Sequence, residues 1–100
     1  MTYTVIVFHA NGEICRSTQP KAPNYDQQKN AVGGYIETVP HFTKYDGMTR
    51  GTCYANEDGI GKFLPFNKNA TDAWLACLGK GPFAYKPRLY GDVIFYARSK

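Results

Sequence analysis

Cysteines and long apolar runs are scarce in this chain of 100 residues. The three cysteines, Cys15, Cys53 and Cys77, are an odd number and show no CxxC spacing, which argues against a disulfide framework or a zinc ribbon and favours a reducing compartment. No apolar run approaches the ~18 residues of a membrane span, and Met1 to Phe8 lacks the basic leader of a signal peptide. We therefore expect a cytoplasmic protein with no membrane partner.

Motifs of catalysis and of cofactor binding are also missing. His9 and His41 are the only histidines, and neither has a cysteine or carboxylate at ligand spacing, so a metal site would need a tertiary coincidence. The glycines of Gly79-Lys80-Gly81 follow a helical pattern instead of opening one, and no GxxxxGK[ST] occurs, which excludes a Walker loop. The sequence predicts a protein that is not an enzyme and needs no cofactor or metal.

The composition is that of one folded domain. A chain of 100 residues is too short to divide into two cores, and 43% apolar residues are enough for one. The aromatic share of 15% is high and argues against disorder throughout. We expect residues 1–100 to form a single domain.

The first segments predict a hairpin that contains an interior strand. Residues 3–8 (YTVIVF) are apolar on both alternating faces, as in a strand that is covered on two sides. Asn11-Gly12 is a typical hairpin turn, and residues 13–16 would form the shorter second strand. Residues 17–24 contain two prolines and are expected to form a loop.

A first helix is expected over residues 25–32. Asn24 is a suitable N-cap, and Gln27 would complete a capping box by bonding back to it. Gly33 or Gly34 would supply the left-handed exit.

A second pair of strands is expected over residues 35–39 and 50–55, with a hairpin turn at Asp46-Gly47. Residues 62–66 (KFLPF) are apolar but contain a proline, so we expect a buried irregular or edge segment.

The second helix is expected to begin at Asn67 or Asn69 and to end at Gly79. Apolar residues recur at helical spacing and predict a buried face centred on Trp74: Ala70, Ala73, Trp74, Cys77 and Leu78. Residues 79–88 then form a basic loop rich in glycine and proline, and residues 89–97 a last, central strand. The order β-β-α-β-β-α-β predicts an α+β fold with two helices on one mixed or antiparallel sheet.

Positive charge is concentrated in the second part of the chain. Residues 1–59 carry five basic and six acidic side chains, whereas residues 60–100 carry seven basic and two acidic ones, a net charge of +5. Such a field attracts anions, although no two basic residues are adjacent and scattered charges also serve solubility. If the anion is a nucleotide, five residues are our candidates for base stacking and phosphate contact: Tyr35, Lys62, Lys80, Tyr85 and Arg88.

Five short segments together carry a family resemblance. They are Asn11-Gly12-Glu13, the VGGYIE of residues 32–37, the NEDG of residues 56–59, the LPFN of residues 64–67 with Ala70, and Gly91-Asp92-Val93. In order and spacing they resemble an uncharacterised domain family found chiefly in phages and in mobile or conjugative elements. Each segment also has a structural explanation, such as a helix exit at Gly33 or a helix cap at Asn67.

The resemblance implies a viral or mobile-element accessory protein that acts on a host component in the host cytoplasm. Together with the charge it favours a non-enzymatic protein that sequesters an anionic nucleotide signal of a defence system. Two alternatives remain open, a nucleic-acid-binding accessory domain and a protein-interaction or homo-oligomer-forming module.

Overall fold

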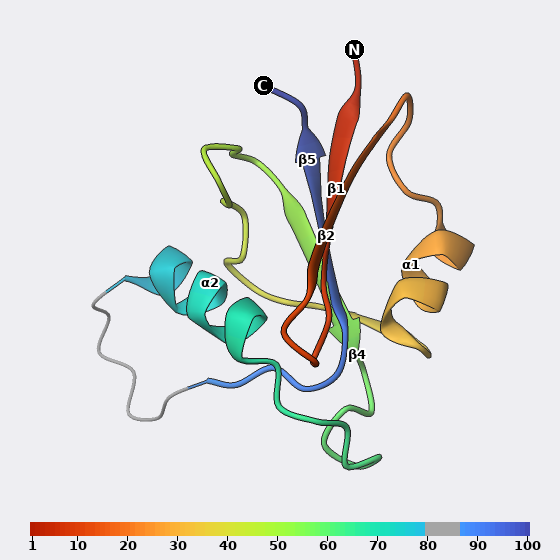
Figure 1. The fold of residues 1–100 in the computed structure, drawn as a ribbon, viewed down its shortest axis with the longest axis vertical. Helices are drawn as coiled ribbons and strands as arrows, with labels where there is room; N and C mark the ends of the chain where they lie inside the picture. The colour runs from red at the N-terminus through yellow and green to blue at the C-terminus, as the bar shows by residue number, and fades with distance from the viewer. Residues whose placement is uncertain (80–86) are drawn as a thin grey trace.

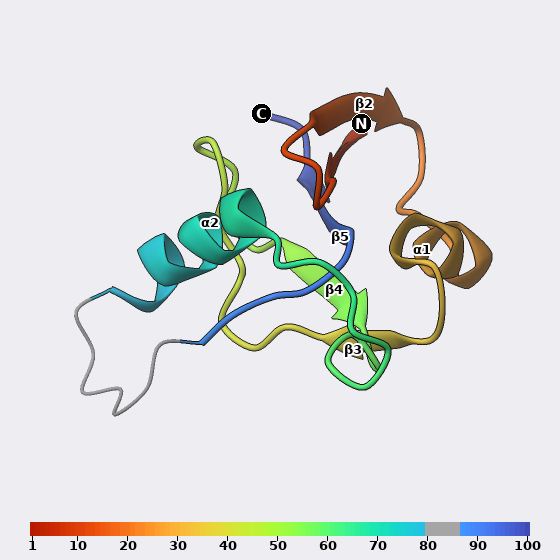
Figure 2. The same cartoon turned by 60° about the horizontal axis from the view of Figure 1, so that its bottom comes forward.

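The computed structural model describes residues 1–79 and 87–100. Within them the chain forms one five-stranded antiparallel sheet with the strand order β2-β1-β5-β4-β3, and two helices pack on its opposite faces (Figures 1 and 2). This confirms the predicted α+β class and element order. The elements are β1 (Tyr3–Phe8), β2 (Ile14–Gln19), α1 (Tyr25–Val32), β3 (Ile36–Thr38), β4 (Thr52–Asn56), α2 (Lys68–Leu78) and β5 (Val93–Arg98).

The hairpin of β1 and β2 turns at Asn11-Gly12, as predicted. Gly12 has a φ of 100°, which a residue without a Cβ adopts at little cost, and its N–H donates to the carbonyl of His9. The predicted end of the second strand was wrong, because β2 stays in register with β1 as far as Gln19, opposite Tyr3. The loop therefore begins at Pro20, which has no N–H to give to a sheet.

The first helix has the predicted bounds. The Asn24 side chain accepts a hydrogen bond of 2.8 Å from the N–H of Gln27, and Gly33 ends the helix with a φ of 78°. The prediction that Gln27 bonds back to Asn24 was wrong, because the Gln27 side-chain amide instead pairs with that of Gln19 through bonds of 2.7 and 3.2 Å. This pair ties α1 to the end of β2.

The segment between β3 and β4 is more than a hairpin turn. Asp46 and Gly47 do form a tight turn, with φ of 51° and 80° and paired bonds between Tyr45 and Met48. The two strands pair over three residues each, from Ile36 opposite Asn56 to Thr38 opposite Tyr54. Residues 39–51 leave the sheet and place apolar side chains over the face that α2 covers.

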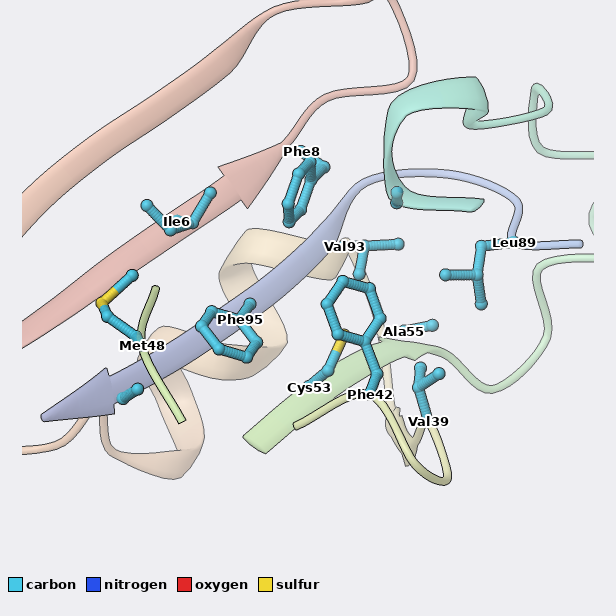
Figure 3. Close-up of a cluster of buried hydrophobic side chains, with 12 residues drawn as sticks. Ile6, Phe8, Val39, Phe42, Met48, Cys53, Ala55, Leu89, Val93 and Phe95 are labelled. Atoms are coloured by element: carbon cyan, nitrogen blue, oxygen red, sulfur yellow. The ribbon is translucent and has the colours of Figure 1, made fainter. Parts of the chain in front are cut away.

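The larger core lies between the sheet, this segment and α2. Phe42 packs against Phe95 and Phe8, with ring centroids 5.5 and 6.1 Å apart (Figure 3). Four of the five residues of the predicted stripe join this core, namely Ala70, Ala73, Trp74 and Cys77, whereas Leu78 is partly buried outside it. The centre of the stripe is Ala70, which is fully buried. Trp74 is only partly buried because its indole N–H reaches out to the carbonyl of Pro40 at 2.7 Å.

Two expectations for the chain around α2 were wrong. Residues 62–66 are irregular, as expected, but they are not buried, since Phe63 is 93% and Phe66 44% exposed. The last strand is central, as predicted, but it begins at Val93 and not at residue 89. Residues before it form an isolated bridge between Tyr90 and Phe66 instead of entering the sheet.

One buried asparagine joins the start of α2 to β1 and to the residues just before β5. The Asn67 side chain is fully buried, and its oxygen accepts from the N–H of Ala70 at 3.1 Å to cap α2. Its nitrogen donates to the carbonyls of Phe8 at 2.7 Å and Gly91 at 2.8 Å. Both the oxygen and the nitrogen of this buried amide thus form hydrogen bonds, and these bonds fix the position of α2.

We expect Asn67→Ala to lower the free energy of unfolding by about 2–4 kcal/mol, because it removes a helix cap and leaves two buried carbonyls without this donor. Urea denaturation followed by circular dichroism measures the change. Asn69→Ala is the matched control, since the Asn69 amide donates only to the exposed carbonyl of Gly12. Equal losses in the two variants would contradict the role assigned to Asn67.

Candidate functional site

A hollow opens where β5 runs past the beginning of β4. The two strands pair only over Thr52–Tyr54 and Ile94–Tyr96, so the last residues of β5 keep β1 as their partner in the sheet. Their other side faces residues 47–50, and a hollow of about 660 Å³ lies between them. We call it the basic hollow, and its lining residues are Tyr3, Gly47, Met48, Thr49, Arg50, Tyr96, Ala97, Arg98, Ser99 and Lys100.

Among the described residues, three with cationic side chains and none with an acidic side chain line the basic hollow. Arg98 stands at the exposed end of β5, and Arg50 is placed by a left-handed backbone with a φ of 56°. Lys100 crosses over Gly47 so closely that a Cβ there would overlap its amine. Among the described residues, none of these three cations takes part in an ion pair. Their charge is therefore available to an anionic ligand.

The acid beside the basic hollow already has a partner. Asp46 Oδ2 accepts a hydrogen bond from the guanidinium of Arg16. This bond and the charge of Arg16, with a smaller contribution from Lys100, lower the pKa of Asp46 below its ordinary value. The negative charge of Asp46 is therefore paired with Arg16, and Asp46 is not among the lining residues of the basic hollow.

Tyrosines form a row beside these cations. Tyr3 and Tyr96 line the basic hollow with ring centroids 6.4 Å apart, and Tyr54 continues the row 6.4 Å beyond Tyr96. The register of the sheet places all three rings on the face that α1 packs against. Burial, reinforced by the neighbouring Tyr96 hydroxyl, raises the pKa of Tyr54, so the Tyr54 hydroxyl carries no negative charge near pH 7. We call these residues the tyrosine row.

The residues predicted from the sequence lie elsewhere. Tyr35 lies at the opposite end of the sheet and is 60% exposed. The Lys29 amine lies 4.8 Å from the centroid of the Tyr35 ring. The amine of Lys62 lies beside Gly34, the residue before Tyr35. Arg88 stacks at 5.8 Å over the ring of Phe66 and lines a different hollow from Lys62. The structure thus brings Tyr35 near Lys62 but does not join Arg88 to them in one hollow. Lys80 and Tyr85 lie outside the described residues.

The described positive charges of residues 60–100 are therefore divided between two ends of the sheet. Arg98 and Lys100 lie at the basic hollow, whereas Lys62 and Arg88 lie at the other end. Lys68 forms an ion pair of 2.7 Å with Asp72. A sequence count of charge cannot reveal this division, since only the strand register decides which end a residue reaches.

The segments of the family resemblance meet at the end opposite the basic hollow. Seven residues from four of these segments line a smaller hollow of about 260 Å³: Val32, Gly33, Asn56, Leu64, Pro65, Gly91 and Asp92. The polar members hold the backbone together. Asn56 donates 3.1 Å to the carbonyl of Val32, and a Cβ on Gly34 would lie 2.8 Å from the Asn56 amide. The geometry thus supports the structural explanation of these residues.

A histidine and an aspartate 83 positions apart meet at this same end. Asp92 Oδ2 lies 2.9 Å from His9 Nδ1, and Asp92 Oδ1 accepts a hydrogen bond of 2.9 Å from the N–H of Ala10. Sequence reasoning missed this pair because no local spacing signals it. Within residues 1–79 and 87–100, no cluster of three or more metal-ligating side chains is found. The same residues contain no helix that is both long and apolar enough to cross a bilayer.

The three cysteines differ in surroundings. Cys53 is buried in the core, and this burial raises the pKa of its thiol well above the ordinary value. Cys77 is partly buried and its Sγ donates 3.1 Å to the carbonyl of Lys44, while Cys15 is exposed on β2. None of the three lines the basic hollow.

We expect Ellman's reagent near pH 8 to label Cys15 within the native protein and to label Cys53 only after unfolding, because a buried neutral thiol is a poor nucleophile. Mass spectrometry of partly labelled protein assigns the order. Cys15→Ser should remove the fast phase and serves as the control. Fast labelling of Cys53 in the folded protein would contradict its structural role.

The chain was compared with family models, with curated proteins and with solved structures, and none of them matches it. The resemblance to the phage and mobile-element family therefore stays a prediction from the sequence. What the protein binds has to be inferred from the basic hollow and the tyrosine row themselves.

Proposed function

We propose that this protein is a non-enzymatic binding protein that holds a phosphate-bearing nucleotide in the basic hollow. The observation that carries the proposal is the lining, where the described residues supply three cations, two tyrosines and no aspartate or glutamate. The predicted function class is kept, but its residues move from Tyr35, Lys62 and Arg88 to Arg50, Arg98 and Lys100.

The chemistry of the lining fits a nucleotide in two ways. The planar guanidinium groups of Arg50 and Arg98 can each bond two phosphate oxygens, and the Lys100 amine adds a point charge. Tyr3 and Tyr96 offer ring faces and edges against which a base can pack. The volume of about 660 Å³ lies in the range of small-molecule sites, roughly 300–1,000 Å³.

The same lining supports binding without turnover. It contains no histidine, cysteine, aspartate or glutamate, which are the side chains that most often act as general bases or nucleophiles. The hydroxyls of Thr49 and Ser99 have no such base beside them in the lining. A protein that sequesters a nucleotide signal inside a host cell needs to bind the nucleotide through its charge and does not need to convert it chemically.

We expect Arg98→Gln and Arg50→Gln each to weaken nucleotide binding about tenfold or more, because each removes a charge-assisted contact to phosphate. A thermal-shift screen with cyclic and linear nucleotides finds the ligand, and calorimetry measures the loss. Lys68→Gln is the matched control, since it removes one charge from an ion pair outside the hollow. No stabilisation by any nucleotide at about millimolar concentration would overturn the proposal.

A second candidate function, a homo-oligomer-forming module, is favoured by one observation. Ile60 and Phe63 stand 75% and 93% exposed on the turns that follow β4. These two large apolar side chains are close together in the sequence, and burying them against a second copy of this chain would remove their apolar surface from water, which is favourable.

If this second candidate is right, the protein has the mass of a dimer in light scattering after gel filtration, and Phe63→Ser makes it monomeric. The substitution should leave stability nearly unchanged because Phe63 is 93% exposed. A monomeric mass of the unmodified protein at about 100 µM would exclude this function.

A further inference from the structure

We infer that the nucleotide ligand is part of a single-stranded nucleic acid, whose bases pack on the tyrosine row and whose phosphates lie along the basic hollow. This inference rests on the proposed function and names its ligand class. The observation that carries the inference is that the tyrosine row leads into the basic hollow, whereas a site for a single nucleotide would not need the further ring of Tyr54.

The tyrosine row crosses three adjacent strands on one face of the sheet. Tyr3 belongs to β1, Tyr96 to β5 and Tyr54 to β4, and each ring is partly buried. Each ring therefore has one part packed on the sheet and another part in contact with solvent. Tyr54 and Tyr96 rest against the small cluster of Val5, Val32 and Ile94 that α1 covers, which fixes the sheet side of the row.

The spacing of the rings suits separated bases. Neighbouring centroids are 6.4 Å apart, which is wider than the roughly 3.4 Å rise of stacked bases in a duplex. Bases that bind along the row would thus pack on rings and not on one another. A duplex keeps its bases paired and stacked inside, so only a single strand can use the row in this way.

One of the cations, Arg98, continues the row on the same face. Arg98 lies directly opposite Tyr3 across β5 and β1, and it is two residues beyond Tyr96 on β5. Side chains two positions apart on a strand share a face, so the Arg98 side chain leaves the sheet on the face that carries both rings. Arg50 and Lys100 then line the hollow past the edge of β5. A backbone that follows the rings from Tyr54 to Tyr3 would bring its phosphates to these cations.

The base-packing surface is tested by fluorescence anisotropy with labelled oligothymidylate and oligouridylate and with a DNA duplex of equal length, at low salt. We expect the single strands to bind at least tenfold more tightly than the duplex and than thymidine monophosphate or uridine monophosphate. Affinity should fall steeply as salt is raised, because phosphate contacts release counterions.

Two variants separate stacking from folding. Tyr54→Leu should weaken binding of the single strands about fivefold or more and leave binding of mononucleotides in the hollow unchanged, because Tyr54 does not line it. Tyr54→Phe keeps the ring and should bind like the unmodified protein. Tyr90→Leu is the matched control, since Tyr90 lies away from the row and contacts Phe66.

The outcomes distinguish the two proposals. If mononucleotides bind and Arg98→Gln weakens them, while single strands bind no tighter and Tyr54→Leu changes nothing, the inference fails and the proposed function stands. Equal affinity for the duplex and the single strands also overturns the inference. If neither mononucleotides nor single strands bind, both proposals fail.

Discussion

The structure depends on one constraint, which is that the two central strands are apolar on both sides and need cover on both. Val93, Ile94 and Phe95 of β5 are no more than 1% exposed, although successive side chains point to opposite faces of the sheet. One short helix shields Ile94 on one face. On the other face α2 shares this task with residues 39–51, which fold across to supply Phe42 and Met48. The long excursion between β3 and β4 is a consequence of this demand.

The basic hollow follows from that same excursion. Because residues 39–51 leave the sheet to cover the core, β4 begins only at Thr52 and cannot accompany β5 to its end. The last residues of β5 then face a loop across an open space, and the polar side chains of both segments line it. Gly47 lets Lys100 approach, and Arg50 adopts its left-handed backbone in the return of the loop. Core packing and a ligand-sized opening thus arise from one feature of the chain.

The two ends of the sheet use polar residues for opposite purposes. At the end where α2 begins, Asn56, Asn67 and Asp92 direct their side chains to backbone groups and are satisfied within the protein. At the other end the cations of the basic hollow are exposed, and no aspartate or glutamate is found among the described residues of the lining. Polar groups that are already bonded hold a fold together, whereas charges that are not paired are free to bind.

Local signals in the sequence determined the α+β class, the hairpin at Asn11-Gly12 and the helix that starts at Asn24, because turns, caps and alternation act over a few residues. The same signals placed Asn67 as a cap and could not show its bonds to Phe8 and Gly91. The sequence also indicated a surplus of positive charge in residues 60–100, but not where it lies. Only the tertiary structure decided that Arg50 joins Arg98 and Lys100, and that His9 meets Asp92. The physical reason is that a binding site is made of residues that strand register brings together across long sequence separations, and no local pattern encodes that register.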